Sequence, residues 1–272
     1  MSLRELTHRN IKKAPSTTPI IDIARLMQCF KIGSVFLEEG QALTGVVTES
    51  DLVRIALTGG VPFNTSVRLI MSSPIIEMDI NRSVIEANHI MHFNGIRHLG
   101  ISEHGRIVGL ISVRDLVHYF STCAESPLHD LGDILKPLSV LTHRDVEAVG
   151  SSISVQRAAQ KMKERKIGSL FVSEEEHYTG IITEADMVRK VVSYGLDPSK
   201  IAVGVIMNTP IVDIDISRSV LEANDIMSQK KVRHLAVTEK GKIVGVLSIR
   251  DLIGMISIRD LPRFFQLKDS LA

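Results

Sequence analysis

"VRHLAVTEKGKIVGVLSIRDL" (residues 232–252) is the stretch that decides the fold. Residues 232–238 and 243–248 are rich in apolar and β-branched side chains, which is typical of strands. "EKGK" between them predicts a hairpin turn with Gly241 at positive φ. Residues 249–256 then predict the start of a helix. The stretch therefore predicts an antiparallel strand pair that leads directly into a helix.

Residues 210–231 complete the unit in front of this hairpin. "PIVDID" alternates as a short strand, and "SVLEANDIMSQKK" (219–231) carries Val220, Ala223 and Met227 at helical spacing. Ser217 or Ser219 can cap this helix. The predicted unit is strand–helix–strand–strand–helix.

The same unit occurs four times. Its hairpin ends in "GVVTESDLVR", "GLISVRDLVH", "GIITEADMVR" and "GVLSIRDLIG", which begin at residues 45, 109, 180 and 245. Residues 70–116 align without a gap to residues 206–252, and about half of the aligned positions are identical. We therefore predict an α/β (α+β) fold of four βαββα repeats. Module 1 is 1–122 (repeats 7–60 and 66–122), a linker is 123–133, and module 2 is 134–272 (repeats 134–197 and 202–265).

Composition excludes several classes of protein. The chain has 272 residues, 44% hydrophobic and 23% charged, with a net charge of +1, which argues against nonspecific nucleic-acid binding. No apolar run reaches the roughly 18 residues of a membrane span, and no secretory signal is visible, so we expect a cytoplasmic protein. Cys29 and Cys123 are expected to be buried, reduced thiols, and no metal site is indicated.

The recurring Gly-x-x-[Ser/Thr]-x-x-Asp motif has two interpretations. A helix that starts at the Ser or Thr offers unpaired N–H groups to a phosphate, and the Asp can accept both hydroxyls of a ribose. The same spacing is also a capping box, in which the acid binds the cap residue and no ligand is needed. Glutamate is the better capping-box acid, yet all four repeats use aspartate.

"KIGSVFLEE…TGVVTESDLVR" and "IRHLGISEHGRIVGLISVRDL" resemble cystathionine β-synthase (CBS) domains, which pair as Bateman modules. The resemblance covers nearly the whole chain and implies adenosine-containing ligands in clefts between repeats. It assigns ribose binding to the motif aspartates Asp51, Asp115, Asp186 and Asp251. It places the motif hydroxyls near the phosphates, at Thr48, Ser112, Thr183 and Ser248.

A second candidate position lies at the start of the central strand. The even repeats carry Arg97-His98 and Arg233-His234, and the resemblance implies phosphate contacts there. The odd repeats carry small residues that allow close approach of an adenine or a backbone, namely Gly33, Ser34, Gly168 and Ser169. Arg54 and Arg189 are weaker phosphate candidates or surface helix charges.

We expect a non-catalytic regulatory protein. It would bind AMP, ADP or ATP and signal energy status to a regulated protein partner or through its own assembly, with a homodimer formed through the Bateman modules. A scaffold with empty or degenerate clefts, or a sensor of S-adenosylmethionine or methylthioadenosine, is the alternative. No nucleophile or metal constellation indicates an enzyme. The second "SIRDL", with Ser257 and Asp260, is expected to be an echo of the motif within the closing helix.

Overall fold

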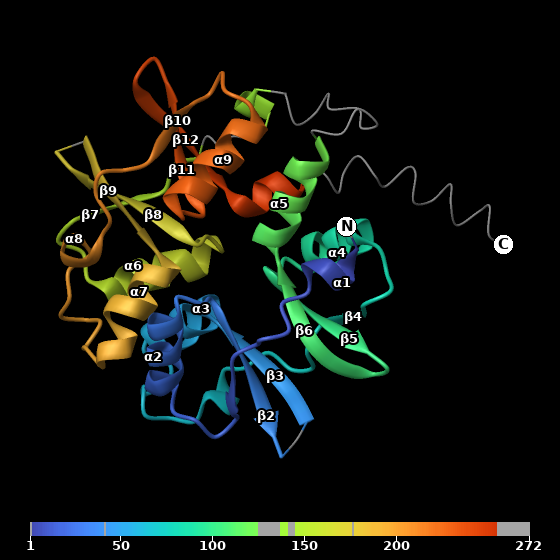
Figure 1. The fold of residues 1–272 in the computed structure, drawn as a ribbon. Helices are drawn as coiled ribbons and strands as arrows, with labels where there is room; N and C mark the ends of the chain where they lie inside the picture. The colour runs from blue at the N-terminus through green and yellow to red at the C-terminus, as the bar shows by residue number, and fades with distance from the viewer. Residues whose placement is uncertain (1, 41, 125–136, 141–144, 176, 255–272) are drawn as a thin grey trace. The chain divides into compact units, whose positions relative to one another are not determined.

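The computed structural model describes residues 2–40, 42–124, 137–140, 145–175 and 177–254. Within these residues the chain forms four three-stranded sheets with helices between them (Figure 1). The strands are β1 (Lys13–Pro15), β2 (Ser34–Glu39), β3 (Ala42–Thr48), β4 (Glu77–Asp79), β5 (His98–Glu103), β6 (Arg106–Ser112), β7 (Ala148–Gly150), β8 (Ser169–Glu174), β9 (His177–Thr183), β10 (Asp213–Asp215), β11 (His234–Glu239) and β12 (Lys242–Ser248).

The helices separate and follow these strands as the repeat unit predicts. The α-helices are α1 (Leu3–Leu6), α2 (Ile20–Phe30), α3 (Glu49–Asp51), α4 (Val84–Phe93), α5 (Val113–Ala124), α6 (Val155–Arg165), α7 (Glu184–Lys190), α8 (Val203–Ile206) and α9 (Val220–Lys230). Shorter or differently wound helical turns are η1 (Leu52–Leu57), η2 (Val67–Leu69), η4 (Leu138–Val140) and η5 (Val192–Tyr194).

All four sheets share one topology. In each, a short first strand pairs in parallel with the central strand, which pairs antiparallel with the third strand. Each antiparallel pair also shifts register at the equivalent place, as between Leu37 and Glu38 or between Val237 and Thr238. The predicted βαββα unit is therefore confirmed in every repeat.

Local chemistry explains the boundaries of the fourth repeat. Ser219 is the residue that caps α9, because its Oγ accepts from the backbone N–H of Glu222 at 3.2 Å. Ser217 instead donates to Asp215 in the preceding turn. The β11–β12 turn places Lys240 at φ 52° and Gly241 at φ 75°, as a two-residue hairpin with two positive φ angles requires.

The chain divides into two compact units. Unit 1 contains Met1–Asn10, Ile76–Asp145 and Val212–Ala272, and unit 2 contains Ile11–Ile75 and Val146–Ile211. Unit 1 thus joins the second and fourth repeats, and unit 2 joins the first and third. This division differs from that of the predicted modules, 1–122 and 134–272, and the pairing of neighbouring repeats into modules stays a prediction.

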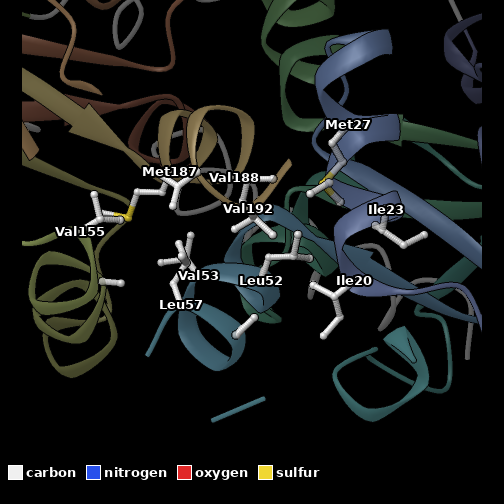
Figure 2. Packing of buried hydrophobic residues seen from close by; sticks show 14 of the residues in the cluster. Ile20, Ile23, Met27, Leu52, Val53, Leu57, Val155, Met187, Val188 and Val192 are labelled. Carbon is white, nitrogen blue, oxygen red and sulfur yellow. The ribbon is translucent and has the colours of Figure 1, made fainter. Parts of the chain in front are cut away.

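The core of unit 2 draws on both of its repeats. Ile20, Ile23 and Met27 of α2 point inward at helical spacing and are fully buried. Figure 2 shows them with side chains from η1, α6, α7 and η5. Each such side chain contributes about 1.5–3 kcal/mol by leaving water. The burial that stabilises this unit therefore comes from residues more than 130 positions apart in sequence, such as Ile20 and Val155.

The expectation that both cysteines are buried is wrong for Cys29, which is exposed on α2. The reason is the helical period, since Cys29 follows the inward-facing Met27 by two residues, a rotation of about 200°. The side chain of Cys123 lies outside the described residues.

Candidate functional site

The four motifs all lie where a strand passes directly into a helix. β3, β6 and β9 lead into α3, α5 and α7, and β12 leads into helical residues 249–254. In unit 2 the cap residues Thr48 and Thr183 have extended backbone, with φ −122° in both. The predicted setting of the motif, a hydroxyl residue at the start of a helix, is thus present in each repeat.

Each motif aspartate accepts hydrogen bonds from its own cap residue. Oδ2 of Asp51 accepts from the backbone N–H of Thr48 at 2.8 Å and from its hydroxyl at 2.7 Å. Oδ2 of Asp186 accepts from Thr183 in the same way, at 3.0 and 2.6 Å. In repeats 2 and 4 the corresponding backbone bonds run from Ser112 to Asp115 at 2.7 Å and from Ser248 to Asp251 at 2.6 Å. The capping-box interpretation therefore describes real bonds in all four repeats.

The capping bonds occupy only part of the hydrogen-bond acceptor positions of a carboxylate. Its two oxygens offer about four acceptor positions, and the bonds from Thr48 use two of those on Asp51. A ribose diol brings two donors, so it can bind the same carboxylate without breaking the cap. The two interpretations of the motif are therefore compatible at Asp51.

The residue just before each central strand uses its backbone carbonyl to bind the N-terminus of the helix that follows the motif. The carbonyl groups of Gly33 and Gly168 accept from the first helical N–H, at 3.1 Å in both cases. Arg97 and Arg233 do the same in the even repeats, at 3.0 Å. At the N-terminus of each of the four helices that follow a motif, one backbone N–H group is thus already satisfied by the chain.

The register brings the remaining predicted positions together within each repeat. Ser34 lies opposite Thr48 and Ser169 lies opposite Thr183 on paired strands. His98 and His234 hold the same places, opposite Ser112 and Ser248. The two candidate positions of a repeat, in the motif and on the central strand, are therefore direct neighbours.

Asp51 lies in an electrostatically mixed environment. Burial raises its pKa above the ordinary aspartate value, and the hydrogen bonds from Thr48 partly offset that effect. The nearby carboxylate of Glu184 also raises the pKa, whereas Arg54 lowers it. Glu184 belongs to the third repeat, so the charge state of the first repeat's motif depends on the third.

Two buried acids in unit 2 were missed by the sequence analysis. Glu49 is fully buried and its Oε1 lies 3.0 Å from a terminal nitrogen of Arg189. Glu184 is also buried, and its Oε1 accepts from the Ser50 hydroxyl at 2.7 Å. The sequence does set these two glutamates apart, because both odd motifs read Thr-Glu where the even motifs have Ser-Val or Ser-Ile. Arg189 thus forms an ion pair between the third repeat and the first. The sequence predicts a phosphate ligand or a surface helix charge at this position and does not indicate this pairing.

Basic residues of both even repeats influence His98 in unit 1. Loss of hydration lowers the pKa of His98, the positive charges of Arg97, Arg233 and Arg114 add to this effect, and together they bring the pKa to about 3. Its Nδ1 is buried and has no hydrogen-bond partner among the residues that the structure describes. Arg97 and Arg233 therefore act on one imidazole, although they lie in different halves of the sequence. His98 is neutral at physiological pH and would meet a ligand as a polar group rather than as a cation.

The described residues contain no group of three or more His, Cys, Asp or Glu side chains placed to hold a metal ion. Across the same residues, no helix has both the length and the apolar character needed to cross a membrane. Ser257 and Asp260, the predicted echo of the motif, lie outside the described residues.

The fourfold repetition agrees with a match to a known family. The family model of the CBS domain matches residues 3–58, 67–122, 133–193 and 203–258, which together make up most of the chain. The chain belongs to the CBS domain family. The resemblance and the repeat fold read from the sequence are thereby confirmed.

Curated relatives share CBS repeats at moderate identity. An uncharacterized protein of Methanopyrus kandleri is 34% identical over 113 residues, which are 41% of this chain and 58% of that protein. The Arabidopsis thaliana CBS domain-containing protein CBSCBSPB2 is 25% identical over 252 residues, covering 82% of this chain and 47% of that protein. The chain spans about half the length of the curated relatives it matches.

Two solved structures resemble the whole four-repeat chain. A Methanocaldococcus jannaschii protein, proposed to be an archaeal homologue of γ-AMPK, superposes with a TM-score of 0.79 at 17% identity, covering 94% of this chain and 99% of that one. A conserved protein of Pyrococcus horikoshii gives a TM-score of 0.62, also at 17% identity, covering 94% and 100%. At these identities the likeness is one of fold. The four-repeat CBS arrangement is thus shared, while the roles of the individual motif residues stay predictions.

Proposed function

We propose that this CBS protein is a non-catalytic regulator that binds adenosine nucleotides, AMP, ADP or ATP, in clefts between repeats. Its output would pass to a protein partner or to its own assembly, including a homodimer. Ligand occupancy regulates only if the ligand prefers one arrangement of the protein over another. The observation that carries the proposal is the motif aspartate at the start of a helix, present four times and, at Asp51, with acceptor positions to spare.

The proposed roles within a site follow from chemistry. The motif aspartates would accept the ribose hydroxyls. The cap hydroxyls would lie near the phosphates, together with the Arg97-His98 and Arg233-His234 pairs, because guanidinium groups bind phosphate through paired N–H donors. Small residues at Gly33, Ser34, Gly168 and Ser169 would leave room for the adenine.

A scaffold function is the second candidate, and one observation favours it. The capping bonds account for every motif aspartate without any ligand. In a scaffold, removing Asp186 would change only stability, by about 1 kcal/mol, as for other helix caps.

Isothermal titration separates the two candidates. We expect AMP, ADP or ATP to bind the full chain, and Asp186→Ala to weaken binding by about 1.5–3 kcal/mol, the size of a hydrogen bond to a charged group. Glu222→Ala is the matched control, because it removes a capping box of the same kind at the start of α9, outside the motif. S-adenosylmethionine and methylthioadenosine serve as competing ligands.

If S-adenosylmethionine or methylthioadenosine gives a heat of binding and none of the three nucleotides does, the ligand is one of those two compounds. If none of the five compounds binds, the regulatory proposal fails and the scaffold is favoured. Equal affinity in the wild type and in an Asp51→Ala/Asp186→Ala double variant would move the site to Asp115 and Asp251.

A further inference from the structure

The N-terminal segment is docked on the second repeat within unit 1. Leu3 and Leu6 of α1 are buried in the core of that unit. His8 then pairs with Leu110 of β6 through two backbone hydrogen bonds, at 2.9 and 3.1 Å. Arg4 and Arg9 both reach Glu103, at 2.7 and 3.4 Å. The segment is therefore held by apolar burial, backbone bonds and charge.

The motif glycine is what allows this docking. A Cβ added to Gly109 would lie 2.6 Å from the carbonyl oxygen of His8, closer than real contacts allow. Gly45 and Gly180 admit the backbone of Ser72 and Asn208 in the same way, with a Cβ-to-oxygen distance of 3.0 Å in both. The group that approaches the motif glycine in these three repeats is therefore the segment that precedes another repeat.

The docked segment differs between repeats in what it brings to the aspartate. In repeat 2 the Nε2 of His8 donates to Oδ1 of Asp115 at 2.9 Å. Ser72, the counterpart of His8 beside repeat 1, donates its hydroxyl to no atom of Asp51 in the described structure. Asn208, the counterpart beside repeat 3, accepts from Lys190, whose Nζ also lies 3.4 Å from Oδ1 of Asp186.

The hydrogen bond from His8 limits how many further donors the Asp115 carboxylate can accept. Asp115 accepts two bonds from Ser112, both at 2.7 Å, and one from His8. Three of its roughly four acceptor positions are then used, and a ribose diol needs two. Asp51 uses two and has room for the diol. The diol can bind Asp115 fully only if the imidazole of His8 leaves.

We propose that His8 masks Asp115, so that the second repeat takes a cis-diol nucleotide more weakly than the first and binding there releases the His8 side chain. This inference rests on the proposed nucleotide binding and adds a specificity residue outside the family motif. The His8 side chain is 61% exposed, so it can leave the carboxylate without opening the core. Masking raises the apparent dissociation constant by the inverse of the unmasked fraction.

The test compares AMP titrations of the full chain as wild type, His8→Ala, His8→Ala/Asp115→Asn and, as a control, His177→Ala. His177 is an exposed imidazole at the start of β9, and its Nδ1 hydrogen-bonds to the backbone carbonyl of Glu175 at 2.9 Å. We expect His8→Ala to tighten the weakest AMP-binding step by roughly three- to tenfold, as the loss of one competing hydrogen bond implies. The gain should disappear in the double variant and be absent in His177→Ala.

The outcomes distinguish the two proposals. If the wild type binds AMP and His8→Ala changes nothing, masking is wrong while nucleotide binding stands. A gain that survives Asp115→Asn also overturns masking, because it does not pass through that carboxylate. AMP binding by His8→Ala but not by the wild type supports masking in its strongest form. If neither protein binds AMP, masking of an AMP site is wrong, whereas the proposed nucleotide binding fails only if the other four compounds also do not bind.

Discussion

The ion pair between Glu49 and Arg189 should stabilise unit 2 by tying its two repeats together. Glu49 has no exposed side-chain surface, whereas Arg189 is 31% exposed, and the two charged atoms are 3.0 Å apart. At an effective dielectric constant of about 20, Coulomb's law gives a gross attraction on the order of 5 kcal/mol. Loss of hydration offsets much of this, but removing one partner leaves the other charge buried.

We therefore expect Arg189→Met to lower the free energy of unfolding by about 2–4 kcal/mol. Glu49→Gln removes the charge that would be left behind, so the double variant Glu49→Gln/Arg189→Met should regain part of that loss. Urea denaturation of the four proteins, followed by circular dichroism, gives the coupling energy from a double-mutant cycle, which should reach about 1 kcal/mol or more.

Lys200→Met is the matched control. Lys200 pairs with Asp197 in the same unit at 3.4 Å, but their side chains are 80% and 49% exposed. Such a pair contributes about 0–1 kcal/mol at most. If Arg189→Met behaves like Lys200→Met, or if the cycle gives no coupling, the ion pair does not hold the two repeats together.

Two further perturbations test unit 1. Because the pKa of His98 falls from about 6.5 in the unfolded chain to about 3 when folded, the unfolded state binds the extra proton and stability decreases as the pH falls through this range. Between pH 7 and pH 5 the wild type should lose about 2 kcal/mol more in urea unfolding than His98→Gln, and parallel curves would contradict the low pKa. Gly109→Ala should displace the N-terminal segment, lowering stability by about 1–3 kcal/mol and speeding tryptic cleavage after Arg4 and Arg9. Gly150→Ala, whose added Cβ would meet nothing within 4 Å, should do neither, and equal cleavage of the two variants would contradict the close-packing argument.

Local patterns were sufficient to predict the repeat unit. The alternation of "PIVDID", the helical spacing in residues 219–231 and the turn at Gly241 all act over a few neighbouring residues, and the structure has each element. The choice between Ser217 and Ser219 needed the backbone, because both are serines within reach of a helix start. The exposure of Cys29 could have been predicted from the period of α2, which places it opposite Met27.

The candidate site could be predicted only in part. The aspartate motif and its two interpretations follow from residues three apart, and the structure contains the capping bonds. The acids Glu49 and Glu184 stand in the same motifs, but their partners Arg189 and Ser50 come from another repeat. No spacing in the sequence connects those residues.

The sequence by itself determined the four repeats, their strand order and the position of each motif, because hydrophobic period, turn residues and helix caps are local properties of the chain. Tertiary structure decided which side chains from distant parts of the chain lie beside each candidate site residue. His8 reaches Asp115, and Arg233 lowers the pKa of His98, only because strands and helices more than 100 residues apart pack in one unit. Packing between distant segments sets the electrostatic environment of Asp51 and uses one of the acceptor positions of Asp115, and neither effect can be read from the local sequence.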